Sequence, residues 1–225
     1  MMAKMKQSKL DFSHIPFLQS MPEEMAEVIF NKENIKHFKK GNYVFRENES
    51  SNALYIIVSG KMKLVRYDSQ GREQIVGIFG TGESIWEGLL SEGSRFPFSG
   101  ICLSSSQICI VEKSVFINCL KDSNLAFNIM AMLSQKLHDA NERNILLSTK
   151  DPKEKLASFL LYRQNRDKEE AIELKLEDIA ASLAIRPETV SRALSSLIQE
   201  GLVERVGKSK IKVKDYEGLK EAAYE

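Results

Sequence analysis

The feature that most constrains the fold is a series of short apolar runs between Ile35 and Val111, separated by glycine-centred breaks. The runs are rich in β-branched and aromatic residues, which favour strands, and the breaks hold residues that favour tight turns. The clearest runs are 43–45, 54–58, 62–67, 74–79 and 107–111. Short strands at this spacing indicate an antiparallel sandwich or barrel. Residues 62–79, around Asp68-Ser69-Gln70-Gly71, predict a hairpin.

A helical texture replaces the strands after Glu112. We expect a short helix over 114–120 and then a long helix from Ser123, whose hydroxyl can cap it, to about Ser148. Asp151-Pro152 signals a new helix start, so a domain boundary is expected just before it. The predicted parts are a strand-rich domain over 1–122, a connecting helix over 123–148 and a second domain over 149–225.

The expected long helix carries a stripe of residues at alternating spacings of three and four, which is the pattern of a heptad seam. The stripe consists of Met130, Leu133, Leu137, Ala140, Asn144 and Leu147. Two interpretations are open. The stripe packs against the helix's own domain, or it forms the seam of a parallel homodimer in which Asn144 fixes the register.

The second domain is expected to be mostly helical, with a terminal hairpin. The expected helices cover 153–165, 176–183 and 187–200, and the hairpin covers 202–214. Gly201 fits the position that follows a helix end. Ala180 and Ala184 are small enough to let two helices cross closely, and Ile185 is expected to fill the turn. Two short helices followed by a β-hairpin are the order of a winged helix-turn-helix.

The start of the last long helix carries the residues expected to read DNA. Glu188, Ser191 and Arg192 lie at i, i+3 and i+4, on one outward face. Arginine can donate two bonds to guanine, and glutamate can accept one from cytosine. The other interpretation is an exposed Glu–Arg pair on a helix surface. The preceding helix and the following hairpin favour DNA binding.

Charge distribution matters more here than net charge. The whole chain carries +1, and residues 149–225 contain fifteen basic and fifteen acidic residues. The basic residues gather on the terminal hairpin, where they suit phosphate contact. We expect Thr189, Lys208 and Lys210 to contact the DNA backbone. A solvated charged face is the other interpretation of the hairpin.

With these motifs the chain resembles the CRP/FNR family of bacterial transcription regulators over essentially its whole length, most strongly from Ile179 to Arg192. The resemblance implies an α+β chain: an N-terminal cyclic-nucleotide-binding-type antiparallel β-roll, a long dimerisation helix and a C-terminal winged helix-turn-helix. Glu188, Ser191 and Arg192 resemble the FNR branch, where these residue types read a TTGA-type half-site. The implied site is a palindrome like TTGAT-N4-ATCAA. The implied partners are double-stranded DNA, a second copy of the chain and, for an activator, RNA polymerase.

The resemblance places the family's phosphate-binding cassette between Gly82 and Ser99. The residues expected around an effector are Glu83, Ile85, Trp86, Arg95 and Ser99. A cAMP site needs an arginine followed by a small hydroxyl residue, to neutralise a buried phosphate. Arg95 is displaced by one position and Phe96 stands in that place, so we expect no cAMP binding. Glu83 is expected to be structural, and Trp86 either lines a pocket or packs in the core.

The cysteines exclude one sensing mechanism and leave others open. Cys102, Cys109 and Cys119 cannot supply the four thiolates of an iron–sulfur cluster, so no such cluster is expected. The thiols are either buried and inert or part of a redox switch. Haem has only the isolated histidines His14, His37 and His138 in its favour. The effector, and the choice between activation and repression, are left open.

Composition excludes several other classes. With 43% hydrophobic and 28% charged residues, the chain is typical of a soluble globular protein. No apolar run approaches the roughly 20 residues of a membrane span, and residues 1 to about 30 look helical without the apolar segment of a signal peptide. The odd cysteine count without metal-site spacing indicates a reducing, cytoplasmic compartment.

Two other functional classes, an enzyme and a cyclic-nucleotide-binding module, fit the sequence less well than a DNA-binding regulator. An enzyme is not expected, because GxSxG, HExxH and a glycine-rich phosphate loop before a lysine are all missing from the sequence. No metal site is expected either. The alternative is a cyclic-nucleotide-binding regulatory module that acts on a protein partner. Such a module requires a complete phosphate cassette and no recognition helix. In this sequence the cassette is incomplete and the pattern of a recognition helix is present.

Overall fold

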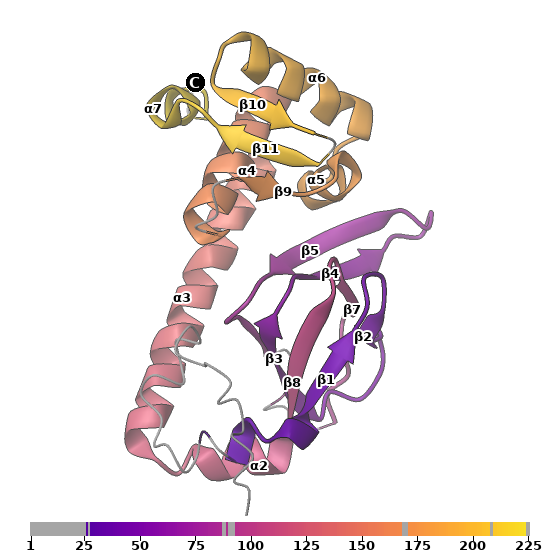
Figure 1. Cartoon of the computed structure of the whole chain (residues 1–225), viewed down its shortest axis with the longest axis vertical. Coiled ribbons are helices and arrows are strands. Elements are labelled where there is room, and N and C mark those ends of the chain that lie inside the picture. The colour runs from indigo at the N-terminus through magenta and orange to yellow at the C-terminus, as the bar shows by residue number, and fades with distance from the viewer. Residues whose placement is uncertain are drawn as a thin grey trace, which may run out of the picture. The chain divides into compact units, whose positions relative to one another are not determined.

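The computed structural model describes residue 26, residues 28–86, residue 89 and residues 93–167, 171–207 and 209–223. The chain packs as two compact units, one formed by residues 1–63 and 79–132 and the other by residues 64–78 and 133–225 (Figure 1). Most of the helix expected within residues 1 to about 30 lies outside the described residues; its last turn is closed by the bond from the N–H of Phe30 to the carbonyl of Ala26 (2.8 Å). Within the described residues, no helix is both long and apolar enough to span a membrane.

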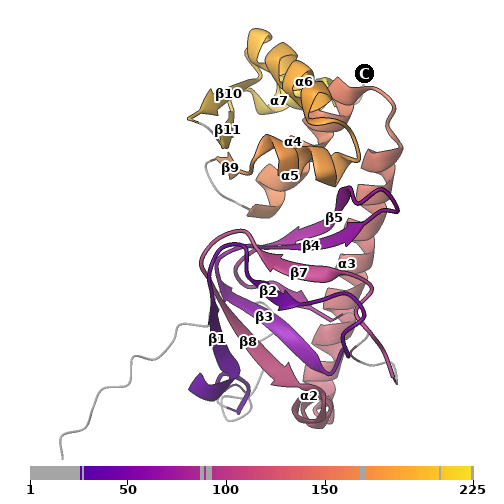
Figure 2. The same cartoon turned by 90° about the vertical axis from the view of Figure 1, so that its right-hand side faces the viewer.

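The strand-rich region forms two four-stranded sheets, as the glycine-broken runs predicted. One sheet has the order β1-β8-β3-β6 and the other β2-β7-β4-β5 (Figure 2). The strands are β1 (Ile35–Phe38), β2 (Tyr43–Phe45), β3 (Ala53–Ser59), β4 (Met62–Tyr67), β5 (Glu73–Phe79), β6 (Ser84–Ile85), β7 (Ser99–Cys102) and β8 (Ser106–Glu112). The register is antiparallel wherever it is defined, for example Ile56 opposite Cys109 in the β3–β8 pair. This is the antiparallel roll that the resemblance implied.

The predicted hairpin between β4 and β5 is present, and Asp68 organises its turn. One carboxylate oxygen of Asp68 accepts bonds from the backbone N–H groups of Gln70 (2.8 Å) and Arg72 (2.9 Å), and the other accepts from Nε of Arg72 (2.8 Å). The bonds from Arg72 lower the pKa of the Asp68 carboxyl. Gly71 completes the turn with φ +74°, a conformation that glycine adopts without strain.

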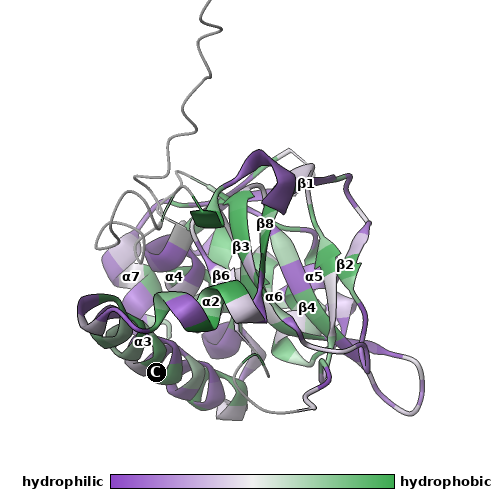
Figure 3. Cartoon of the chain, turned by 90° about the horizontal axis from the view of Figure 1, so that it is seen from below, coloured by the Kyte–Doolittle hydropathy of each residue, from purple (hydrophilic) through white to green (hydrophobic). Residues whose placement is uncertain are grey.

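The core of the first unit lies between the sheet of β3 and β8 and two helices, α2 (Lys113–Cys119) and the start of α3 (Ser123–Ser148). Apolar residues dominate β3 and β8 (Figure 3). They pack against Phe116, Leu125 and Ile129 from the helices. The bounds of α3 agree with the predicted helix, but its cap differs. Asp122 accepts the bond from the N–H of Leu125 (2.8 Å), so the side chain one position before Ser123 caps the helix.

The second unit contains the predicted helices and hairpin. Its elements after α3 are α4 (Pro152–Asp167), β9 (Ile172–Glu173), α5 (Leu176–Leu183), α6 (Pro187–Gln199), β10 (Val203–Val206), β11 (Lys210–Val213) and α7 (Tyr216–Glu221). Asp151 caps α4 by accepting bonds from the N–H groups of Lys153 and Glu154 (2.8 and 3.0 Å). Gly201 follows α6 with φ +75°, as predicted. The strands form an antiparallel sheet in the order β10-β11-β9.

The turn between α5 and α6 differs from the prediction at one alanine. Ala180 is buried, as expected for a close helix crossing, but Ala184 is exposed. Ala184 ends α5 in the left-handed conformation, with φ +54°, and its N–H bonds to the carbonyl of Ala180. Ala184 therefore reverses the chain rather than separating two helices.

Candidate nucleic-acid interface

The start of α6 exposes the three residues predicted to read bases. Glu188, Ser191 and Arg192 are all exposed. The opposite side of α6 is buried through Val190, Ala193, Leu194 and Leu197. Pro187 occupies the first turn, where its missing N–H costs no helix bond. Because the buried side fixes the rotation of the helix, the three polar side chains share one outward face.

Glu188 and Arg192 form no ion pair with each other or with any other described residue. Arg192 instead directs its Nε toward the backbone carbonyl of Glu188, at 3.5 Å. The guanidinium keeps most of its donors for a ligand. The simple Glu–Arg surface pair, the other interpretation of this spacing, is therefore not what the structure contains.

The residues predicted to contact the DNA backbone differ in their burial and in their neighbours. Thr189 is half-buried in the first turn of α6, and its N–H bonds to the carbonyl of Arg186 (3.0 Å). Lys208 lies outside the described residues. Lys210 is exposed at the start of β11, where its Nζ lies 3.6 Å from a carboxylate oxygen of Glu173. Glu173 lies on the short strand β9, which the sequence pattern did not predict.

Helix α3 carries an exposed apolar stripe. Phe127, Met130, Leu137 and Ile145 are each at least 60% exposed, and Leu133 is also exposed. Of the other predicted seam residues, Ala140 and Asn144 are exposed and Leu147 is half-buried. The buried residues of α3 are different ones and include Leu125, Ile129 and Leu146. The predicted stripe is therefore not mainly an intrachain packing face, and Phe127 and Ile145 extend it.

The three polar residues predicted around an effector are all bonded to backbone groups. A carboxylate oxygen of Glu83 accepts the N–H of Gly80 (2.7 Å), which closes a tight turn as expected. The hydroxyl of Ser99 accepts the N–H of Glu47 (3.0 Å). Arg95 donates from Nη1 to the carbonyl of Asn48 (2.7 Å). Each of these three side chains therefore has a structural role in the roll.

The two apolar members of the predicted effector set lie in the core. Ile85 and Trp86 are buried. The Trp86 ring packs edge-on against Phe116, with ring centres 5.0 Å apart, and its Nε1 donates to the Ser84 hydroxyl. Of the two interpretations of Trp86, these contacts favour core packing.

An aromatic trio fills the part of the roll beside the cassette. Phe96, only 1% exposed, stacks on Phe45 with ring centres 3.9 Å apart and an interplanar angle of 18°. Tyr55 meets both rings, at 5.0 Å from Phe45 and 5.8 Å from Phe96. Burial raises the pKa of the Tyr55 hydroxyl, with a smaller contribution from Glu49. The residue at the place expected for a phosphate-binding group is thus an apolar ring in a packed cluster.

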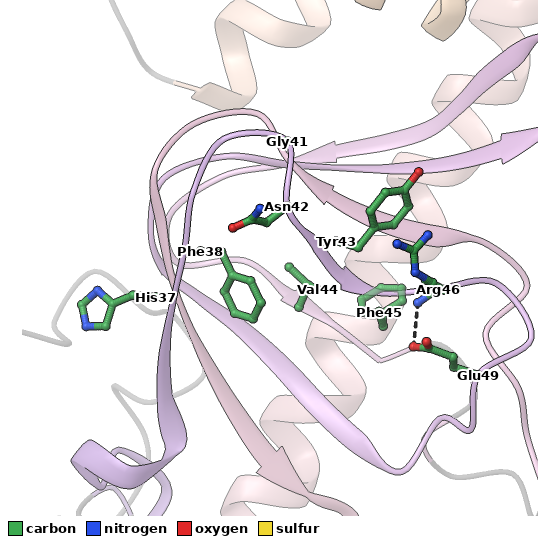
Figure 4. A pocket seen from close by; sticks show the side chains of 9 residues that line it. All are labelled: His37, Phe38, Gly41, Asn42, Tyr43, Val44, Phe45, Arg46 and Glu49. Carbon is green, nitrogen blue, oxygen red and sulfur yellow. Dashed lines mark hydrogen bonds between the residues drawn. The ribbon is translucent and has the colours of Figure 1, made fainter.

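A separate open groove of about 550 Å³ lies at the turn between β1 and β2 (Figure 4). It is lined by His37, Phe38, Gly41, Asn42, Tyr43, Val44, Phe45, Arg46 and Glu49. Arg46 lies over the Tyr43 ring, at 3.8 Å from its centre, and its backbone N–H donates to Glu49 (2.8 Å). None of the five predicted effector residues lines this groove.

The three cysteines are buried and unreactive in character. Burial raises the pKa of each thiol, and raises that of Cys109 to about 12. Cys109 also donates its S–H to the carbonyl of Ile29 (3.2 Å). A redox sensor needs an exposed thiol with a lowered pKa, so these settings favour the inert interpretation.

The histidines and acidic residues show no metal cluster. His37 and His138 are exposed on β1 and α3, and His14 lies outside the described residues. In the part of the chain that the structure describes, no three His, Cys, Asp or Glu side chains come together as metal ligands would.

Comparison with known proteins gives two family matches. Residues 35–123 match the cyclic nucleotide-binding domain, and residues 154–222 match the Crp-like helix-turn-helix domain. The chain is 26% identical over 211 residues to the cyclic AMP receptor protein of Thermus thermophilus, covering 93% of this chain and 97% of that protein. It is 29% identical over 213 residues to the electron transport regulator A of Shewanella oneidensis, covering 90% and 84%. The solved structure of FixK2 from Bradyrhizobium japonicum matches with a TM-score of 0.76 and 25% identity, covering 85% of this chain and 97% of that one.

Proposed function

Because the chain belongs to the CRP/FNR family of transcription regulators, we propose that it controls transcription by binding, as a homodimer, a palindromic site resembling TTGAT-N4-ATCAA. The observation that carries the proposal is the shared outward face of Glu188, Ser191 and Arg192 at the start of α6. A recognition helix meets base edges with its N-terminal residues, which is where these three lie.

Each of the three side chains has a chemical counterpart in the proposed half-site. The Arg192 guanidinium can donate two parallel bonds to O6 and N7 of a guanine, and the Glu188 carboxylate can accept from N4 of a cytosine. Ser191 can bond to either a donor or an acceptor. Thr189, Lys208 and Lys210 would hold the sugar-phosphate backbone and so fix the register of α6 in the groove.

The α3 stripe supports the homodimer. A row of side chains as exposed as Phe127, Met130, Leu137 and Ile145 is unusual on a monomer and typical of an interaction face. Two parallel copies of the stripe would bury these residues against each other, with Asn144 at a core position of the seam. A two-fold dimer would place one α6 in each of two major grooves, one helical turn of DNA apart. If the DNA site lies at a promoter position from which the protein activates transcription, RNA polymerase would be a further partner.

The first unit would bias this DNA binding without binding cAMP. Phe96, at the position where the resemblance leads us to expect a phosphate-neutralising arginine, stacks on Phe45, and Glu83, Arg95 and Ser99 are bonded to backbone. The similarity to the cyclic AMP receptor protein of Thermus thermophilus therefore does not carry that ligand over to this chain. For the same reason, a cyclic-nucleotide module acting on a protein partner is not supported.

The proposal is tested by fluorescence anisotropy of the purified protein at a stated, near-physiological salt concentration. Three duplexes are compared: TTGAT-N4-ATCAA, a variant with CRP-type half-sites, and a scrambled sequence. We expect the first to bind about a hundredfold or more tighter than the scrambled duplex, within the usual specificity range. Equal binding to all three duplexes, with and without added cyclic nucleotide, haem or thiol oxidant, would refute the proposed site.

A further inference from the structure

Strand β9 brings an acidic side chain onto the wing, the sheet of β9, β10 and β11. Glu173 lies directly opposite Lys210 in the antiparallel pair of β9 and β11, and Ile172 lies opposite Ile211. Ile172 and Ile211 are buried. Side chains alternate along strands, so Glu173 and Lys210 share the other face, which we call the outer face of the wing. The Glu173 carboxylate lies 3.6 Å from the Lys210 ammonium there.

The outer face repeats this arrangement along β10. Glu204 lies opposite Lys212, and a carboxylate oxygen of Glu204 is 3.4 Å from Nζ of Lys214. By strand alternation the outer face carries three lysines and two glutamates: Lys210, Lys212, Lys214, Glu173 and Glu204. The charge pattern of the hairpin predicted that its basic residues suit phosphate contact, with a solvated charged face as the other interpretation. In the structure two of them are held beside carboxylates of the same sheet.

We propose that Glu173 acts through Lys210 to lower the affinity of the wing for DNA phosphates. A phosphate that approaches Lys210 must compete with the Glu173 carboxylate for the Lys210 ammonium. The effect falls on backbone contact, which is independent of sequence, and leaves base reading by α6 unchanged. By weakening the backbone contacts, Glu173 would increase the share of the DNA-binding free energy that comes from the base contacts of α6. This inference rests on the proposed DNA binding.

Glu173 is suited to this role because the wing does not depend on the ion pair for its fold. Both side chains are about half exposed, 51% for Lys210 and 56% for Glu173, and pairs this exposed contribute little to stability. The strand is held instead by the buried Ile172 and by the bond from the N–H of Leu174 to the carbonyl of Ser209 (2.9 Å). Removing the carboxylate is therefore expected to leave the fold intact.

The test measures binding of the full-length protein to the scrambled duplex and to TTGAT-N4-ATCAA over a range of salt concentrations. We expect Glu173→Gln to bind the scrambled duplex about two- to fivefold tighter, the range of an exposed ion pair. The dependence of log K on log salt should steepen by up to about 0.9 for each wing that gains a phosphate contact. Glu173→Asp, which keeps the charge, and Glu217→Gln, the same charge change on the exposed surface of α7, serve as controls and should bind like wild type.

A double-variant cycle decides whether Glu173 acts through Lys210. In a Lys210→Gln background, Glu173→Gln should change the affinity and the salt slope little. An unchanged affinity for Glu173→Gln alone, an equal gain for Glu217→Gln, or an undiminished gain in the Lys210→Gln background would each overturn the inference. Failure of the wild type to prefer the palindrome would instead refute the proposed function, so the two failures are distinguishable.

Discussion

The Phe45 and Phe96 rings stack 3.9 Å apart inside the first unit, although they are 51 positions apart in the sequence. Tyr55 completes the cluster by meeting both rings. The contact joins β2 to the segment just before β7 and fills the roll with the protein's own side chains. Phe96 is therefore a structural residue, at the position where the resemblance leads us to expect the phosphate-binding arginine of a cAMP site.

Replacing Phe96 with alanine should therefore destabilise the protein. The change Phe96→Ala removes a buried ring from two aromatic neighbours, and we expect the free energy of unfolding to fall by about 3–5 kcal/mol. Urea denaturation measures the loss. Val76→Ala, at an exposed position of β5, should change the stability by less than about 0.5 kcal/mol. A Phe96→Ala protein as stable as wild type would show that the ring does not pack as described.

The cysteines should resist modification in the folded protein. Their raised pKa values keep them protonated at neutral pH, and the thiol rather than the reactive thiolate is then present. We expect iodoacetamide at pH 7.5 to label none of the three on a timescale that fully labels the urea-unfolded chain, as measured by intact mass. Rapid labelling of the native protein would revive the redox-switch interpretation.

The dimer seam is tested at the centre of the α3 stripe. The change Leu137→Glu would place two like charges in a dry interface, so we expect the dimer to dissociate in sedimentation velocity experiments. His138→Glu introduces the same residue at the next position, which is exposed but outside the predicted seam, and should leave the dimer intact. A dimer that survives Leu137→Glu would remove the stripe as the interface.

Replacing Ala184, the left-handed residue in the turn between α5 and α6, should stabilise the protein rather than destabilise it. Ala184 has φ +54°, which costs an L-residue about 1–2 kcal/mol, whereas glycine adopts it freely. Glycine also gives the unfolded chain more conformational entropy, which offsets about 0.4–1 kcal/mol of this gain. Ala184→Gly should therefore raise the free energy of unfolding by up to about 1 kcal/mol. Ala181→Gly, inside α5, should lower it by about that amount. Equal destabilisation by both changes would contradict the assigned turn.

Local patterns predicted the local elements. The bounds of α5 follow from its apolar spacing and those of α3 from its flanking turns, and both agree with the structure. Strands β1, β6, β7 and β9 were not named: each has only two to four residues and, unlike β10 and β11, none of them belongs to a predicted hairpin. The cap of α3 was misplaced by one residue because Asp122 and Ser123 both favour that position.

Contacts between distant segments were not predictable in the same way. Nothing near Phe96 in the sequence indicates that it stacks on Phe45, and nothing near Lys210 indicates Glu173. The shared exposed face of Glu188, Ser191 and Arg192 was predictable, because the three residues lie on one short helix whose buried residues set its rotation. Phe127 and Ile145 were not predicted, because the stripe was defined by alternating spacings of three and four that start at Met130, and neither residue falls on that series.

The central claim is that the exposed start of α6 reads the DNA sequence, and Arg192→Ala tests it most directly. Anisotropy would compare this variant and wild type on the palindrome and on duplexes substituted at each half-site base pair. We expect Arg192→Ala to lose about 1–3 kcal/mol on the palindrome and to stop discriminating at one base pair. Lys220→Ala, which removes a cation from α7, should retain wild-type discrimination. A folded Arg192→Ala protein with unchanged affinity and specificity would contradict the claim.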